Sequence, residues 1–396
     1  MGDSCKLNGR IGFRGYTEKD IVTKEIGGVL TFSPTNIVDN KLTMECKNTY
    51  ITREKYDESP EIKIFNGDIL FVKTGSTLGK SALVTGLKED ASINPQIVVM
   101  RVEKDKETFM SNVLITDGIK KQVTAVKIGG AVPTMTETEL KNIKYYEPVE
   151  KEEQKRIGQY FEHLDHLITL HQRKCDETKQ LKKFMLQKMF PKNGEKNPEI
   201  RFEGFTDAWE QRKLDTVAKF SKGSGYSKGD LIETGTPIIL YGRLYTKYET
   251  SISDVDTYVE AKEGSVYSKG GEVIVPASGE TAEDIARAAT VDKSGILLGG
   301  DLNVVMPNED INSAFLAISI SNGNSQRELA KKAQGKSVVH IHNEEIRNLI
   351  VPFPIKAEQN RIVDYFSTLD HLITLHQRKC EKLKALKKFM LQNMFI

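Results

Sequence analysis

Two kinds of hydrophobic pattern alternate along the 396 residues of the chain. Residues 1–148 contain short runs rich in valine and isoleucine, such as GDILFVKTG at Gly67–Gly75 and QIVVMRV at Gln96–Val102. These runs, bounded by glycine, asparagine or aspartate, predict short β-strands separated by turns. From about residue 150 to 190 the apolar residues recur every three or four positions, which predicts one helix of about 40 residues, about 60 Å long. Pro191 and the KNGEKNP sequence that follows end this helix and form a linker.

The second half of the chain repeats this order. LDHLITLHQRKC stands at Leu164–Cys175 and again, unchanged, at Leu369–Cys380, and KKFMLQ follows each copy. GEVIVPASG at Gly271–Gly279 likewise corresponds to GDILFVKTG. Two long, near-identical segments predict an internally two-fold molecule. We expect an α+β fold with two mixed globular domains, residues 1–148 and 193–354, each followed by a long helical segment, residues 149–192 and 355–396.

The repeat is uneven along its length. Residues 335–349 correspond only loosely to residues 129–143, whereas Glu358, Gln359, Arg361 and Ile362 match Glu153, Gln154, Arg156 and Ile157. The helices are nearly copied, while the globular parts share framework positions only. We therefore expect the helices to do the same job twice and the globular parts to do different jobs.

Composition narrows the class of protein. The chain is 38% hydrophobic and 28% charged, its net charge is +2 and its pI is about 8.1. This excludes a polybasic arm, so any nucleic-acid binding must use locally concentrated basic groups or share the phosphate contacts with partners. Four widely spaced cysteines argue against a disulfide framework. With no signal peptide and no membrane-length apolar run, we expect a cytoplasmic protein without a membrane partner.

Three motifs that suggest chemistry have simpler explanations. GSTLGKS at Gly75–Ser81 is one residue short of a phosphate-binding loop, so a glycine-rich turn between strands is favoured. His171 with Cys175, and His376 with Cys380, could offer a Cys₂His₂ metal site, but the seam of a coiled coil explains both pairs. Neither Glu152–Glu153 nor Glu283–Asp284 has a recognisable catalytic partner. We expect no catalytic residue, no metal and no cofactor in this chain.

Candidate DNA-binding residues lie where basic, aromatic and hydroxyl side chains alternate, a mixture that suits contacts to phosphates and base edges. KGSGYSKG and YGRLYTKY, at Lys222–Gly229 and Tyr241–Tyr248, have this character, and GRIGFRGYTEKD at Gly9–Asp20 is their counterpart in the first half. An exposed polar loop explains any single residue equally well. The candidates are Arg14, Tyr16, Lys73, Thr74, Ser76, Lys80, Lys222, Tyr226, Lys228, Tyr241, Arg243 and Lys247.

Taken together, these motifs resemble the specificity subunit of a type I restriction–modification system. The resemblance rests on RFEGFTDAWEQRKL at Arg201–Leu214, on the strands that precede glycine, on the EQ-R-I helix starts and on the two closing LDHLITLHQRKC…LKKFMLQ helices. It covers essentially the whole chain. It implies two target recognition domains, each reading one half of a bipartite site in double-stranded DNA. It also implies that the two long helices pair as an antiparallel coiled coil, which sets the spacing between half-sites and docks methyltransferase subunits.

The resemblance further implies that this subunit is not itself an enzyme. Restriction subunits would join the complex, and the partner subunits would use S-adenosylmethionine, ATP and Mg²⁺. Eight apolar helix residues are expected at the helix seam or at the partner-docking surface: Ile157, Phe161, Leu164, Ile168, Ile362, Phe366, Leu369 and Ile373.

The first half departs from the family pattern in one respect. It has no counterpart of Arg201–Leu214 and starts at about the level of GRIGFRGYT. A truncated chain or the product of a rearranged gene would have this form, which leaves open whether residues 1–148 fold and read DNA. Two other functions therefore stay open: a stand-alone DNA-binding scaffold or regulator, and an inactive cassette that serves only recombination.

Overall fold

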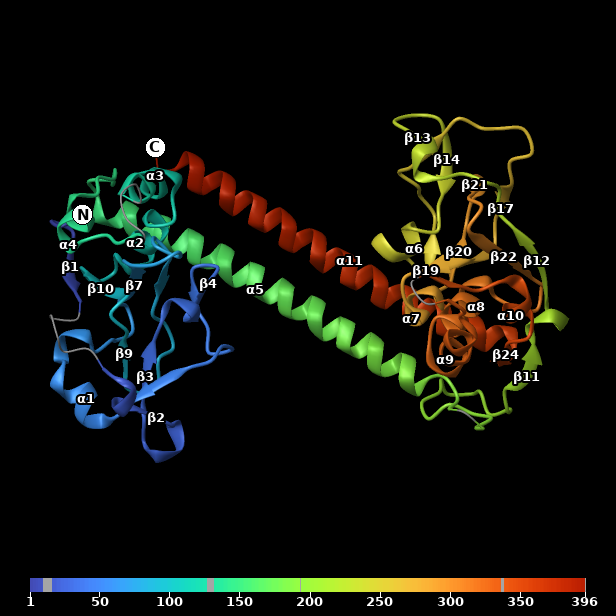
Figure 1. Cartoon of the computed structure of the whole chain (residues 1–396), viewed down its shortest axis with the longest axis horizontal. Helices are drawn as coiled ribbons and strands as arrows, with labels where there is room; N and C mark the ends of the chain where they lie inside the picture. The colour runs from blue at the N-terminus through green and yellow to red at the C-terminus, as the bar shows by residue number, and fades with distance from the viewer. Residues whose placement is uncertain (10–15, 127–131, 193, 336–337, 396) are drawn as a thin grey trace. The chain divides into compact units, whose positions relative to one another are not determined.

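The structure is a computed structural model that describes residues 1–9, 16–126, 132–192, 194–335 and 338–395 (Figure 1). The chain divides into two compact units. Unit 1 consists of Met1–Gln172 and Gln377–Ile396, and unit 2 of Arg173–His376. The two long helices, α5 (Lys151–Lys188) and α11 (Lys356–Asn393), contain 38 residues each, and the division between the units falls inside both. Each unit therefore combines a globular domain with part of both helices.

Unit 1 is built on two four-stranded sheets. The first has the order β1 (Cys5–Asn8), β10 (Ile97–Val102), β7 (Ile69–Val72) and β8 (Ser81–Leu83), with every pair antiparallel. The second has the order β2 (Ile21–Val22), β6 (Thr49–Ile51), β3 (Val29–Phe32) and β9 (Ala91–Ile93), and its β3–β9 pair is parallel. A short hairpin joins β4 (Ile37–Val38) to β5 (Lys41–Leu42). The helices of this domain are α1 (Arg53–Glu58), α2 (Glu107–Val113), α3 (Asp117–Val126) and α4 (Glu137–Asn142).

Unit 2 repeats the first sheet with an additional strand. The order is β12 (Ala218–Lys222), β22 (Leu302–Pro307), β18 (Glu272–Pro276), β20 (Ala289–Val291) and β15 (Ser251–Ile252). Its second sheet has the order β13 (Leu231–Ile232), β16 (Tyr258–Val259), β14 (Thr236–Ile239), β21 (Ser294–Leu298) and β17 (Tyr267–Lys269). Two strand pairs complete it, β11 (Glu210–Lys213) with β24 (Ile350–Phe353) and β19 (Ser278–Gly279) with β23 (Val339–His340). The helices are α6 (Arg243–Thr246), α7 (Ala282–Ile285), α8 (Ser313–Ile320), α9 (Gly323–Lys332) and α10 (Asn343–Arg347).

The central strands are continuously apolar because both of their faces are covered. In β7, Ile69 and Phe71 belong to the core under the long helices, whereas Leu70 and Val72 belong to the core on the opposite face. In β18, Val273 and Val275 likewise belong to the core that includes the long helices, whereas Ile274 belongs to the core on the opposite face. A strand buried on both faces shows no polar alternation, which is the pattern that GDILFVKTG and GEVIVPASG display.

Each long helix begins on one globular domain and ends in the core of the other. In unit 1 the start of α5 contributes Ile157, Phe161 and Leu164 to a core that also contacts Phe395, directly after α11. The Phe395 ring centroid lies 5.7 Å from that of Phe109 and 5.8 Å from that of Phe161. In unit 2 the start of α11 supplies the core residues, and the residues after α5 pack against them. The Phe190 ring centroid lies 5.7 Å from that of Phe315 and 6.3 Å from that of Phe366.

Repeated polar contacts fix the antiparallel pairing within each unit. In unit 1 the Lys387 Nζ lies 2.7 Å from the Asp165 carboxylate, and in unit 2 the Lys182 Nζ lies 2.5 Å from Asp370. Cys380 and Cys175 are buried between the helices, with their Sγ atoms 4.0 Å from the Ile168 carbonyl and 3.9 Å from the Ile373 carbonyl, respectively. This burial favours the seam explanation of the repeated cysteines over a metal site.

The predicted docking role of the apolar helix residues needs a correction. Six of the eight, Ile157, Phe161, Leu164, Ile362, Phe366 and Leu369, are buried in the cores of the chain's own domains. Ile168 and Ile373 are half-buried. The six buried side chains are not open to a partner, because the helices use this face to hold their own globular domains. A docking surface on the helices must therefore be made by other residues.

Within the described ranges, no helix combines the length and the apolar character that a membrane-spanning segment needs.

Candidate nucleic-acid interface

Both units carry a loop that leaves the buried central strand and is fixed by a distant segment. In unit 1 the turn Lys73–Lys80 joins β7 to β8, and Thr74 pairs with Thr134. The Gly75 N–H donates to the Pro133 carbonyl at 2.9 Å, and the Met135 N–H donates to the Lys73 carbonyl at 2.8 Å. In unit 2 the same place is taken by β19, which pairs with β23. The loop backbone is therefore held in a similar way in both units, although its side chains differ.

The GSTLGKS segment is the predicted turn. Gly75 and Gly79 have φ values of +106° and +92°, which favour glycine because an L side chain rarely adopts them. Strand β8 begins at Ser81, the last residue of the motif, where a phosphate-binding loop would begin a helix.

Four predicted DNA-binding residues come together on this turn in unit 1. Ser76 and Lys80 are exposed, and Lys73 and Thr74 are half-buried. The Lys80 Nζ approaches the Ile37 carbonyl at 3.5 Å. Within the part of unit 1 that the structure describes, neither Lys73 nor Lys80 forms an ion pair with a carboxylate. Both ammonium groups are thus available to an anionic ligand.

The corresponding loop in unit 2 carries a different set of polar groups. The Ser278 Oγ lies 3.1 Å from the His340 Nδ1, across the β19–β23 pair. The Tyr245 hydroxyl donates to the Ser278 carbonyl at 2.6 Å, and its ring lies 6.1 Å from that of Tyr241, edge to face. Burial raises the pKa of Tyr245. A Cβ on Gly279 would lie 2.9 Å from the Tyr245 hydroxyl oxygen, so glycine is needed for this approach.

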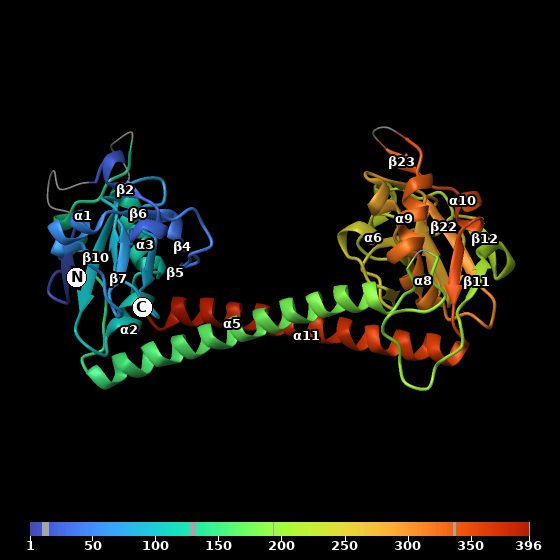
Figure 2. The same cartoon turned by 90° about the horizontal axis from the view of Figure 1, so that it is seen from below.

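Of this cluster the sequence prediction named only Tyr241. Tyr245, Ser278 and His340 were missed, although a signal existed in the correspondence of GEVIVPASG to GDILFVKTG and of residues 335–349 to 129–143. Figure 2 shows β23 at the end of unit 2 that faces away from the side where α5 and α11 run.

Arg243, a predicted DNA-binding residue, is instead a buried structural residue. Its side chain is 8% exposed. Nη1 donates to Asp256 at 2.8 Å, and Nη2 donates to Glu249 and to the Asp254 carbonyl, also at 2.8 Å. A guanidinium used in this way cannot read a base edge, so this prediction is wrong.

Lys247 is exposed but tied to the same acidic group, with its Nζ 2.9 Å from Asp256. The hydrogen bond from Lys247 lowers the pKa of Asp256, and the nearby Arg243 charge adds to the effect. A phosphate approaching Lys247 would therefore meet a neighbouring carboxylate. This makes Lys247 a weaker candidate than Lys73 or Lys80.

Tyr226 holds a neighbouring loop in place. Its hydroxyl group shares a hydrogen bond with the Ser265 hydroxyl and accepts the Lys262 N–H at 2.8 Å. The Lys262 Nζ lies 4.8 Å from the ring centroid and 2.5 Å from Asp230. This hydrogen bond from Lys262 contributes most to lowering the pKa of Asp230 to about 2. Tyr226 is half-buried, and its hydroxyl group and ring already contact Ser265 and Lys262.

The remaining candidates are not brought to the same place. Lys222, at the end of β12, and Lys228, at the start of a 3₁₀ turn, are exposed. Tyr16 is half-buried against a small cluster that consists of Val29 and Ile51, from the second sheet of unit 1, and Tyr56 of α1. Arg14 lies outside the described residues.

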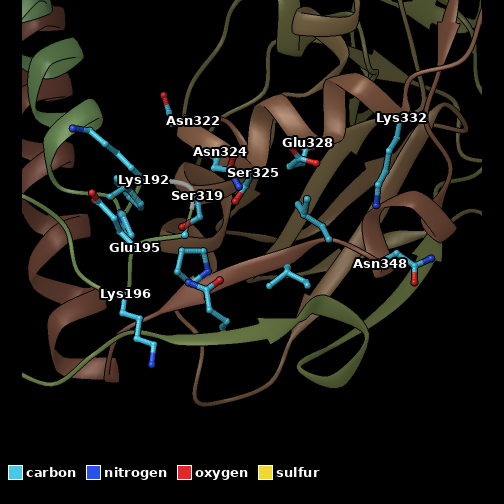
Figure 3. Close-up of a pocket in the computed structure, with 17 residues that line it drawn as sticks. Lys192, Glu195, Lys196, Ser319, Asn322, Asn324, Ser325, Glu328, Lys332 and Asn348 are labelled. Atoms are coloured by element: carbon cyan, nitrogen blue, oxygen red, sulfur yellow. The ribbon is translucent and has the colours of Figure 1, made fainter.

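Unit 2 also contains a cavity of about 560 Å³, beside the segment that follows α5 (Figure 3). Lys192, Lys196 and Lys332 line it together with Glu195 and Glu328. The Ser319 Oγ, also in the lining, is buried without a hydrogen-bond partner among the described residues. Within the described ranges, no group of three or more histidine, cysteine, aspartate or glutamate side chains is placed to hold a metal ion.

Comparison with known proteins identifies the family. The family described as the type I restriction modification DNA specificity domain matches residues 18–180 and again residues 206–385. A curated relative is the specificity subunit of the type I restriction enzyme MjaVIII from Methanocaldococcus jannaschii. It is 23% identical over 352 residues, which cover 83% of this chain and 79% of the relative.

Solved structures show the same fold. The crystal structure of the S subunit of the type I restriction–modification system from M. genitalium matches with a TM-score of 0.63 at 13% identity, covering 100% of this chain and 94% of that chain. A chain from a study of assembly and conformational transition of the type I R-M system matches with a TM-score of 0.51 at 17% identity, covering 98% and 95%. These likenesses confirm the predicted fold class. With the family matched once in each half of the sequence, this chain belongs to the type I restriction–modification DNA specificity family.

Proposed function

We propose that this chain is the DNA-sequence-recognition subunit of a type I restriction–modification complex, and that each unit reads one half of a bipartite site. The observation that carries the proposal is the loop after the central strand. Its backbone is fixed by a distant segment in both units. In unit 1 the loop carries lysines and hydroxyl groups, whereas in unit 2 it carries Ser278, which contacts His340 of β23 and Tyr245 of α6. Recognition of two different half-sites requires different side chains, and here they are presented on a loop whose backbone is held in a similar way in both units.

In this proposal the basic residues and the hydrogen-bonding residues have separate roles. The ammonium groups of Lys73 and Lys80, which have no carboxylate partner among the described residues, would bind phosphates and orient unit 1 on the duplex. Hydroxyl, imidazole and phenol groups, such as those of Ser76, His340 and Tyr241, would form hydrogen bonds to base edges in the major groove. Sequence preference would therefore differ between the units.

We further propose that the long helices dock methyltransferase subunits through apolar side chains that remain exposed. Leu181 and Phe184 of α5 are exposed, as are Leu386 and Phe389 at the matching positions of α11. Residues three apart lie on one face of a helix. Each unit therefore presents one such pair, which suits two identical partners. Restriction subunits would join the same complex, and S-adenosylmethionine, ATP and Mg²⁺ would be bound by the partners.

Methylation sequencing of a host that expresses type I methyltransferase subunits, with and without this chain, tests the function. We expect methyl-adenine at one bipartite motif only when the chain is present. Replacement of residues 201–354 by the matching domain of another family member should change one half-site and leave the other. A change in both half-sites would contradict the modular reading.

A pull-down from the same cells separates the alternatives. Co-purification of the chain with the methyltransferase subunits is expected. DNA binding without co-purification would favour a stand-alone scaffold or regulator. If the chain neither binds DNA nor co-purifies with the methyltransferase subunits, an inactive cassette would be favoured.

A further inference from the structure

One position beside the loop after the central strand is built in the same way in both units. Gln96 directly precedes β10 in unit 1, and Asp301 directly precedes β22 in unit 2. The Gln96 carbonyl accepts the Lys73 N–H at 2.8 Å, and the Asp301 carbonyl accepts the Ala277 N–H, also at 2.8 Å. The strand registers agree as well, because the first residue of β10 pairs with the last residue of β7, and the first of β22 with the last of β18. Gln96 and Asp301 are therefore equivalent.

The backbone at this position is held on both sides of the loop. The Lys73 carbonyl accepts the Met135 N–H at 2.8 Å, and the Ala277 carbonyl accepts the Ile341 N–H at 3.1 Å. Each of these donors belongs to the distant segment that fixes the loop of its unit. A backbone that is already ordered aims a side chain without a further loss of entropy on binding. The two units thus present one side chain each from the same frame.

In unit 1 this side chain is an oriented carboxamide. Gln96 is exposed, whereas its neighbour Asn94 is buried. The Asn94 Nδ2 donates to the Gln96 Oε1 at 3.1 Å, and the Gln96 N–H donates to the Asn94 Oδ1 at 3.0 Å. The Gln96 Nε2 lies 3.4 Å from where a Cβ on Gly75 would stand, so the amide lies beside the turn Lys73–Lys80. Among the described residues this Nε2 has no hydrogen-bond acceptor.

In unit 2 the equivalent side chain is a carboxylate. Asp301 is exposed, and in the described part of the chain its carboxylate forms no ion pair and no hydrogen bond. Burial is the main cause of the raised pKa of Tyr245, and the Asp301 charge adds to it, so this charge lies near the contact of Tyr245 with Ser278. A carboxylate on a surface that meets DNA is repelled by the phosphates. It is favourable there only if a base donates a hydrogen bond to it.

The two side chains match different bases in the major groove. A carboxamide has a donor beside an acceptor, and adenine presents the complementary pair, the N7 acceptor and the N6 amino donor. A carboxylate only accepts hydrogen bonds, and the cytosine N4 amino group donates to it. Guanine presents two acceptors, O6 and N7, which repel a carboxylate. The exchange of glutamine for aspartate therefore changes the preferred base.

We propose that Gln96 and Asp301 each determine one base of the bipartite site, an adenine in the half-site of unit 1 and a cytosine in the half-site of unit 2. This assignment rests on the proposed function and gives it one residue in each unit. Neither residue lies in the stretches of alternating basic, aromatic and hydroxyl side chains, and their equivalence follows from backbone pairing.

Methylation sequencing of a host that expresses type I methyltransferase subunits, with the parent chain or a variant, tests the assignment. Asp301→Asn exchanges the carboxylate for a carboxamide and should change one cytosine of the motif to adenine. Gln96→Glu should change one adenine to cytosine in the other half-site, since glutamate still accepts the hydrogen bond from Asn94. An unchanged motif with either variant would overturn the assignment of that residue, and a change in both half-sites with one variant would overturn the proposal.

DNA binding gives a second readout that does not depend on methylation. Duplexes with the parent motif, and with each of the other base pairs at each specified position of the half-site, are titrated with the purified complex. The parent complex should prefer the adenine and the cytosine by roughly tenfold, and each variant should move the preference to the other base. If a variant fails to methylate, this measurement still decides. Parent preferences that Gln96→Glu and Asp301→Asn leave in place would overturn the proposal.

A matched control separates position from charge. Glu309→Gln removes the same charge from an exposed residue just beyond the opposite end of β22, about 20 Å away along a six-residue strand. This variant should keep the parent motif and the parent affinities. A changed base preference with Glu309→Gln would mean that net charge, and not the position of Asp301, sets the preference, which contradicts the proposal. All three substituted residues are exposed, so thermal unfolding should match that of the parent chain.

Failure of the proposed function gives a different result from failure of this assignment. If the parent chain produces no bipartite motif and its complex does not bind DNA, both are overturned. If the parent chain produces a bipartite motif that both variants keep, DNA recognition stands and only the assignment of Gln96 and Asp301 is overturned.

Discussion

Glu358 and Glu153 occupy equivalent positions in two nearly identical helices, but they have opposite environments. Glu358 is fully buried and bound by both donors of an arginine fork, whereas Glu153 is exposed. The helices alone do not explain this difference, because their sequences match at this point. The burial of Glu358 arises from residues 197–213, which pack against the start of α11 and supply Arg201. The environment of a repeated residue is thus decided by what packs against it.

The largest effect that sharpens this comparison is expected at Trp209. Trp209→Ala would leave a cavity among Phe190 and Phe315, and we expect a loss of about 3–5 kcal/mol in the stability of unit 2. Urea denaturation followed by circular dichroism measures it. Tyr146→Ala in unit 1 is the control and should change stability by less than about 0.5 kcal/mol, because this side chain is exposed. Similar losses in both variants would remove the contrast between the units.

The next effect concerns the two glutamates themselves. Glu358→Gln would leave Arg201 largely buried with no counter-charge, and we expect a loss of about 2–4 kcal/mol in the free energy of unfolding. Glu153→Gln in the same assay should be within about 0.5 kcal/mol of the parent chain. A large loss at Glu153 would show that unit 1 has an internal partner for this carboxylate.

The repeated exposed pairs on the helices allow a test of symmetry. Leu181→Ala with Phe184→Ala, or Leu386→Ala with Phe389→Ala, should each remove about 2 kcal/mol or more of binding to one methyltransferase subunit. Native mass spectrometry should show one bound subunit with either double variant and none with all four substitutions. Retention of both subunits with all four substitutions would place the docking surface elsewhere.

The smallest effects are expected from single lysines. Lys73→Ala or Lys80→Ala should weaken DNA binding about equally for all sequences and reduce the slope of log affinity against log salt by about one. Lys247→Ala should have a smaller effect, because Asp256 already neutralises this charge. Salt titrations of DNA affinity measure all three variants. An equal effect at Lys247 would mean that DNA displaces Asp256.

The sequence by itself determined the elements and their repetition. The two long helices, the apolar central strands and the glycine turn at Gly75–Gly79 follow from local periodicity and backbone preference, and the structure has them at these places. These features can be predicted from the sequence because each depends on residues that are neighbours in the chain. The resemblance to the family can be recognised in the sequence for the same reason, since it rests on repeated local motifs.

Only the tertiary structure decided which side chains are free to act. Arg243 lies in a stretch that has the composition of a DNA-binding loop, but it is buried by Glu249, Asp254 and Asp256, whose approach no local pattern records. The helix residues Ile157, Phe161 and Leu164 have the periodicity of a docking face, but the chain's own core covers them. Ser278 and His340 meet although 62 positions separate them. Burial and pairing across such distances depend on how the elements pack, which the spacing of residues within one element does not specify.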